Sequence, residues 1–184
     1  SLKQSILDHD FHLTSGNQGY RHTMYLLCQN GDVDLLLKVL KNPKYPGWGF
    51  MLANDATSVW ERWEKENQAT MNSFDHPMFG SYDCVFYRYL LGIKIDDIYK
   101  NEVRIEPVFP SSLKEASGSL DTPRGKIEVS YEKKGDGIHF RLFVPVSMKA
   151  KVSFPKGMEV LLGGKKPKLG ALILKNGEHR FLIR

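Results

Sequence analysis

The 184-residue chain has few cysteines, no long apolar run and no metal-binding motif. Its two cysteines, Cys28 and Cys84, lie on apolar faces of expected helices, where a free thiol acts as a small apolar group. No Cys/His spacing fits a zinc site, and no nucleotide-binding motif occurs. No run reaches the roughly eighteen apolar residues that a membrane helix needs. We therefore expect no metal, no cofactor, no disulfide and no membrane span, while the redox compartment and the localisation stay open.

Charge divides the chain into two parts. Residues 1–100 carry 10 Lys+Arg and 12 Asp+Glu, whereas residues 101–184 carry 16 and 9, and all three Trp lie in the first part. This shift predicts a domain boundary near residue 100. The lysines of the second part alternate along expected strands and turns, without an aromatic stacking platform or a nucleic-acid motif. They are typical of solvated faces, so we expect no nucleic-acid partner.

The first part, residues 1–100, shows helical periodicity. Asn30-Gly31 is a stop signal between two helical patterns, and Asp32 is placed to cap the second of them. So short a joint predicts an antiparallel helical hairpin. The segments with apolar residues at helical spacing are 2–8, 20–30, 33–41 and 77–91.

The second part, residues 101–184, changes to a period of two. Seven short alternating segments are separated by turn residues, with Gly135-Asp136-Gly137 and Asn176-Gly177 expected as hairpin turns. This pattern predicts a compact antiparallel β-sandwich, and hence an α+β chain in two parts. The expected strands are 103–108, 126–131, 138–144, 150–154, 159–162, 171–174 and 179–183.

The stretch from Thr57 to Ser81 holds the densest mixture of aromatic, acidic and basic side chains. Trp60 and Trp63 bracket Glu61, and bulky rings that strip water from a carboxylate raise its pKa, which suits a general base. The alternative is that the two Trp fill core while Glu61 pairs with Arg62 in solvent. A second polar cluster follows and could line the same pocket: Asn72, Ser73, Asp75 and His76.

The order of four motifs resembles bacterial α-L-rhamnosidases of the (α/α)6-barrel glycoside hydrolase type. The resemblance covers about residues 10 to 93 and is weak beyond them. The motifs are His12-Leu13-Thr14-Ser15-Gly16, Tyr45-Pro46-Gly47-Trp48-Gly49-Phe50-Met51, Thr57-x-x-Trp60-Glu61-Arg62-Trp63 and Met71-Asn72-Ser73-x-x-His76-x-x-Phe79-Gly80-Ser81.

This resemblance implies that residues 1–100 are the C-terminal part of the barrel and that residues 101–184 are a trailing β-sandwich. It implies inverting hydrolysis of terminal α-L-rhamnosides, with Glu61 as general base and His76 contacting the substrate. Trp48 is either a wall for a sugar ring or an anchor for its loop, and His12 is either a pocket residue or a structural turn histidine. We also expect Trp60, Trp63 and Asn72 near the carbohydrate substrate.

The family's general acid lies in an upstream acidic cluster that has no counterpart before residue 20. We therefore expect the acid in the remainder of a longer polypeptide, and no rhamnosidase turnover from this chain alone. Two alternatives stay open. One is another (α/α)6-barrel glycosidase acting on a different sugar. The other is a non-catalytic module whose sandwich binds carbohydrate or braces the barrel.

Overall fold

The computed structural model describes residues 1–65, 73–96, 100–167 and 172–184. The chain divides into two compact units, Ser1–Val85 and Phe86–Arg184. The division comes earlier than the composition shift near residue 100, because Leu91 and Ile93 already belong to the core of the second unit. Along the described parts of the chain, no helix is both long and apolar enough to cross a bilayer.

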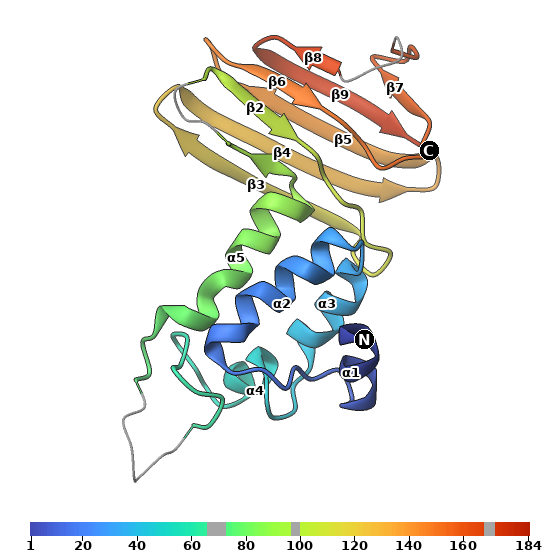
Figure 1. The fold of residues 1–184 in the computed structure, drawn as a ribbon. Helices are drawn as coiled ribbons and strands as arrows, with labels where there is room; N and C mark the ends of the chain where they lie inside the picture. The colour runs from blue at the N-terminus through green and yellow to red at the C-terminus, as the bar shows by residue number, and fades with distance from the viewer. Residues whose placement is uncertain (66–72, 97–99, 168–171) are drawn as a thin grey trace. The chain divides into compact units, whose positions relative to one another are not determined.

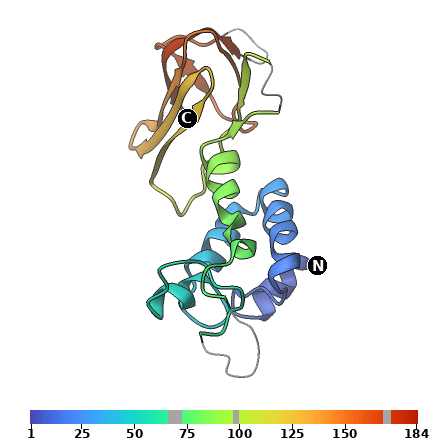
Figure 2. The same cartoon turned by 90° about the vertical axis from the view of Figure 1, so that its left-hand side faces the viewer.

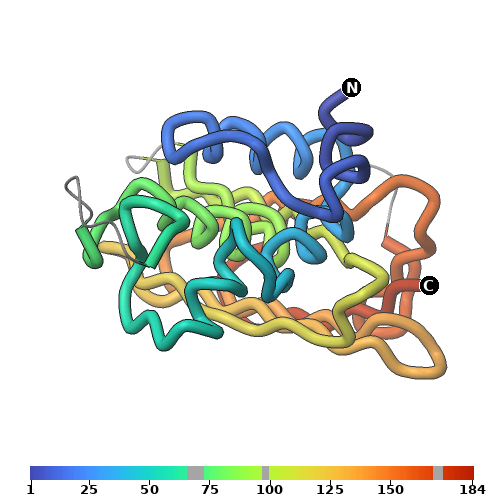
Figure 3. Tube along the Cα trace, turned by 90° about the horizontal axis from the view of Figure 1, so that it is seen from below, coloured from blue at the N-terminus to red at the C-terminus, as the bar shows by residue number. Residues whose placement is uncertain are grey.

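The first unit is helical (Figure 1). α3 returns beside α2 after a three-residue joint, which confirms the predicted hairpin. Asp32 stands at the N-cap of α3 without a capping hydrogen bond, because its carboxylate pairs with Lys3 of α1 instead. The chain can be followed through this unit in Figure 3. Its helices are α1 (Leu2–Asp8), α2 (Asn17–Gln29), α3 (Val33–Lys41), α4 (Trp48–Ala53), the 3₁₀-helix η1 (Pro77–Ser81) and α5 (Tyr82–Val85).

The core of the first unit forms where α2 and α3 meet the aromatic side chains of the later segments. Tyr20 and Met24 of α2 and Leu36 of α3 are each at most 1% exposed, in keeping with their helical spacing in the sequence. The helix predicted over 77–91 is confirmed but is not uniform. It begins as 3₁₀-helix, continues as α5 and becomes the π-helix η2 (Phe86–Leu90) in the second unit.

The second unit is a sandwich of a four-stranded and a five-stranded sheet (Figures 1 and 2). The sheets have the orders β1-β2-β6-β8 and β3-β4-β5-β9-β7. Pairing is antiparallel except between β2 and β6, which run parallel. The described strands are β1 (Ile93–Lys94), β2 (Glu102–Ile105), β3 (Glu115–Thr122), β4 (Gly125–Lys134), β5 (Gly137–Val144), β6 (Lys149–Val152), β7 (Val160–Leu162), β8 (Leu172–Leu174) and β9 (Gly177–Ile183).

One apolar core holds the two sheets together. Val103 and Ala150 of the first sheet and Ile127 and Leu142 of the second are fully buried in the same cluster. The predicted turn at Gly135-Asp136 does join β4 to β5. The hairpin predicted at Asn176-Gly177 is wrong, because β8 and β9 lie in different sheets and the segment crosses between them. The β1 and β3 strands lie outside the seven predicted segments.

Candidate functional site

The candidate site is built on two paired segments of the first unit, residues 58–61 and 73–76. The backbone N–H of Glu61 donates to the carbonyl of Ser73 at 2.8 Å, and the N–H of His76 donates to the carbonyl of Val59 at 2.7 Å. The Ser58 hydroxyl donates to the carbonyl of Phe74. These bonds bring the two sequence motifs together, so that Glu61 and His76 lie on facing stretches of backbone.

The Glu61 side chain is half-buried and held by a backbone donor. The N–H of Ser73 donates to Glu61 Oε2 at 2.9 Å, and Asn17 Nδ2 at the start of α2 donates to the Glu61 carbonyl at 3.3 Å. Within the described residues, Oε1 has no hydrogen-bond partner. One carboxylate oxygen is therefore held by a backbone donor, and the other accepts no hydrogen bond from a described residue.

Trp60 and Trp63, which flank Glu61, are core residues. Trp60 is 4% exposed and contacts Phe74 edge-to-face, with 5.6 Å between the ring centroids. Trp63 is 9% exposed, and its ring lies 3.8 Å from that of Phe79. The two buried rings flank the half-buried Glu61 and Arg62, so the tryptophans anchor this segment while the charged residues between them keep partial access to solvent.

Trp48 is an anchor and not an exposed wall for a sugar ring. Its indole Nε1 donates to the carbonyl of Phe79 at 3.0 Å, and its ring meets Tyr20 at 4.2 Å and Trp63 at 5.4 Å. Only 7% of Trp48 is exposed, so it presents no open face to a ligand. Burial in the same cluster raises the pKa of the Tyr20 hydroxyl far above its usual value.

His12 has both ring nitrogens occupied within its loop. Asn42 Nδ2 donates to His12 Nε2 at 3.1 Å, so Nδ1 carries the proton and donates to the Pro46 carbonyl at 2.7 Å. The same Asn42 group donates to the Asp10 carbonyl at 2.9 Å. This network fits the structural alternative for His12 and leaves its ring no free nitrogen for a substrate.

His76 is the predicted residue whose environment remains suited to binding. It is half-buried at the N-cap position of η1, and its ring makes no hydrogen bond within the described residues. Asn72, the other predicted polar contact, lies outside the described residues. Asn17 is a supporting group that sequence reasoning did not select, whereas Ser73 was expected only as a member of the polar cluster. Ser73 lies in one of the four sequence motifs, but a hydrogen bond from its backbone N–H to Glu61 cannot be recognised from the residue type.

A groove adjoins the paired segments in the first unit. It has a volume of about 610 Å³ and lies between α2 and the η1–α5 stretch. Asn17, which bonds to Glu61, and Pro77, which follows His76, both line it, together with Arg21, Tyr25 and Met78. The Cys84 thiol beside the Tyr25 hydroxyl raises the pKa of Tyr25.

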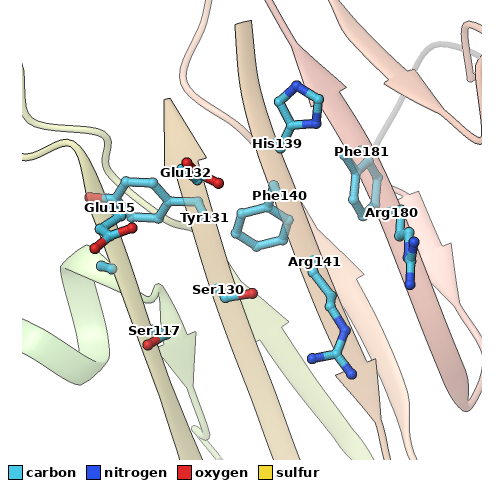
Figure 4. A pocket seen from close by; sticks show the side chains of 11 residues that line it. Glu115, Ser117, Ser130, Tyr131, Glu132, His139, Phe140, Arg141, Arg180 and Phe181 are labelled. Carbon is cyan, nitrogen blue, oxygen red and sulfur yellow. The ribbon is translucent and has the colours of Figure 1, made fainter. Parts of the chain in front are cut away.

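A separate depression of about 640 Å³ lies on the five-stranded sheet of the second unit (Figure 4). The aromatic residues at its floor, Tyr131, Phe140 and Phe181, are at most 3% exposed and belong to the core. Charged side chains on its rim pair with neighbours outside it, for example Arg141 with Glu178 at 2.8 Å. This depression offers no exposed aromatic platform, and its ion pairs are those of a solvated sheet face.

The described side chains form neither a metal site nor a disulfide. Among residues 1–65, 73–96, 100–167 and 172–184, no group of three or more His, Cys, Asp or Glu could hold a metal ion. Cys28 and Cys84 are both free thiols. Burial raises the pKa of the Cys28 thiol to about 12, which makes it an inert apolar group.

Comparisons with known proteins agree on one family. Residues 1–90 match the bacterial alpha-L-rhamnosidase 6 hairpin glycosidase domain, and residues 94–168 match the bacterial alpha-L-rhamnosidase C-terminal domain. An α-L-rhamnosidase of Alteromonas sp. (strain LOR) is 34% identical over 88% of this chain and 18% of its own length. One from Formosa agariphila is 30% identical over 84% of this chain and 17% of its own length.

The solved structures give the same result. The α-L-rhamnosidase from Dictyoglumus thermophilum has a TM-score of 0.88 and 29% identity, and the match covers 100% of this chain and 22% of that one. The chain spans less than a fifth of the length of the two curated relatives described above. The helical unit and most of the β-sandwich thus match two domain models of one family, and the chain belongs to the bacterial α-L-rhamnosidase family of glycoside hydrolases.

Proposed function

We propose that this chain supplies the general base of a glycosidase that removes terminal α-L-rhamnose with inversion at the anomeric carbon. Glu61 is the base and His76 contacts the sugar. The helical unit contributes to the catalytic barrel, and the β-sandwich, whose outer face carries paired charges, takes no part in the chemistry. The substrate class comes from the relatives, which are α-L-rhamnosidases.

The observation that carries this proposal is the asymmetric environment of the Glu61 carboxylate. The Ser73 N–H fixes Oε2, while Oε1 has no partner within the described residues. In the proposed step, Glu61 takes a proton from a water molecule as the water oxygen bonds to the anomeric carbon. The bond to the leaving oxygen breaks, and a carboxylic acid protonates that oxygen.

The proton donor has no counterpart in the described site. Inverting enzymes hold their two carboxyl groups roughly 6.5–9.5 Å apart to admit the water. We propose that a part of the family's catalytic domain beyond these 184 residues provides the acid, because the chain matches only 17–18% of its curated relatives. On this basis the chain by itself has no rhamnosidase turnover.

The test is Glu61→Gln in a full-length enzyme carrying this sequence, assayed on a chromogenic α-L-rhamnoside. Glu64→Gln is the matched control, since Glu64 is an exposed carboxylate three residues away. General-base removal should lower kcat by roughly 10²–10⁴-fold, with the control near wild type. NMR of the first product should show the β-anomer. Full activity of the Glu61→Gln enzyme, or initial release of the α-anomer, would overturn the proposal.

A further inference from the structure

Within residues 58–61 and 73–76, Phe74 carries the one large apolar side chain that is exposed. It follows directly after Ser73, whose N–H binds Glu61 Oε2 at 2.9 Å, and it precedes His76 by two positions. Its carbonyl accepts the hydroxyl of Ser58, so its backbone is part of the pairing that carries Glu61.

The exposure of Phe74 contrasts with that of Trp60, whose ring it contacts, and with that of the other motif aromatics. Its side chain is 49% exposed, whereas Trp60 is 4%, Trp63 9% and Phe79 1% exposed. The edge-to-face contact with Trp60, with centroids 5.6 Å apart, holds the ring in place without covering it. A half-exposed aromatic ring on the segment that joins Ser73, which binds Glu61, to His76 is a surface for an apolar ligand face.

We infer that Phe74 is a substrate-binding residue that packs against the apolar face of the rhamnosyl unit at the Glu61 site. This inference rests on the proposed function. Sugar rings present C–H faces, and a 6-deoxy sugar adds a methyl group where other hexoses carry a hydroxyl. Both are apolar surfaces that an aromatic ring removes from water. Phe74 therefore provides the wall for a sugar ring that was one of the two interpretations of Trp48.

The experiment compares Phe74→Ala, Phe74→Tyr and wild type in a full-length enzyme carrying this sequence. An apolar contact to a substrate is worth about 10- to 200-fold in kcat/KM. We expect Phe74→Ala to lose roughly this factor, mainly through a higher KM, because the contact exists before the transition state. Phe74→Tyr keeps the ring and should restore most of the loss. Tyr87→Ala, which removes a 39%-exposed aromatic side chain of the second unit, is the control.

A binding measurement separates this inference from the role of Glu61. Calorimetric titration with L-rhamnose compares the Glu61→Gln enzyme with the Glu61→Gln, Phe74→Ala double variant. Weaker rhamnose binding by the double variant supports the contact, even if Glu61→Gln alone proves active and the proposed base role fails. Unchanged rhamnose affinity together with an unchanged KM would overturn the inference. The same holds if Phe74→Ala lowers only Tm, because another part of the enzyme would then cover the ring.

Discussion

Replacing Trp48 by Phe tests whether the aromatic cluster of the first unit is core and not a binding surface. The substitution removes the indole N–H that donates to the Phe79 carbonyl at 3.0 Å in a buried setting. A buried carbonyl left without its donor lowers the free energy of unfolding by about 1–3 kcal/mol. The smaller ring also leaves space beside Tyr20, now 4.2 Å from the indole, and beside Trp63, at 5.4 Å. We expect a total loss of about 2–4 kcal/mol in the free energy of unfolding.

The assay is thermal unfolding of the 184-residue chain followed by circular dichroism. A loss of this size lowers Tm by about 5–15 °C in a chain of this length. A full-length enzyme carrying Trp48→Phe should keep the KM of wild type for a rhamnoside when assayed below its transition. The reasoning would be refuted by an unchanged Tm together with a raised KM, because that combination describes a wall of the binding site.

Three further predictions concern stability and reactivity. Gly92→Ala should destabilise the second unit by at least about 2 kcal/mol in denaturant unfolding, since a Cβ at this φ of +72° would lie 2.2 Å from the Pro107 nitrogen. Burial raises the pKa of Glu106, but the Lys94 ammonium at 2.7 Å outweighs it and holds that pKa below its usual value. The stability that this ion pair contributes is therefore present above about pH 4.5 and is lost as pH falls through the folded pKa. Glu106→Gln should flatten this acid dependence of the free energy of unfolding. A thiol reagent should modify the half-buried Cys84 well before the buried Cys28.

Each of these predictions has a contradicting result. Wild-type stability of Gly92→Ala would show that the junction of helix and strand can shift to admit a side chain. Equal acid sensitivity of the Glu106→Gln variant would assign the pH dependence to other carboxylates. Simultaneous labelling of the two thiols in the native chain would mean that the helix carrying Cys28 opens as readily as the surface around Cys84.

The sequence was most informative where burial follows a simple period. Alternation predicted β4, β5 and β9, and helical spacing predicted α2 and α3, because each has one face in a core. The β3 strand escaped prediction since it carries one large apolar residue, Leu120, among small and polar side chains. Its Gly118 instead makes room for the Leu91 side chain, whose Cδ1 would lie 2.5 Å from an added Cβ.

The candidate site shows the same limit. Motif order placed Glu61 and His76 in one region, and the backbone pairing of their segments is consistent with that interpretation. Residue type did not predict which aromatic side chains face solvent. Trp48 is 7% and Phe74 49% exposed, although both lie within the sequence motifs. That difference depends on the tertiary contacts of Trp48 with Tyr20 and Phe79, which no local pattern encodes.

The placement of all three indoles in the first unit gives the chain a natural optical label. Trp48, Trp60 and Trp63 are each at most 9% exposed, while the second unit carries phenylalanines and tyrosines but no indole. Excitation near the red edge of the absorption band therefore monitors only the helical unit. A red shift in emission that precedes the loss of strand signal on heating would reveal the order in which the two units come apart, without any attached dye.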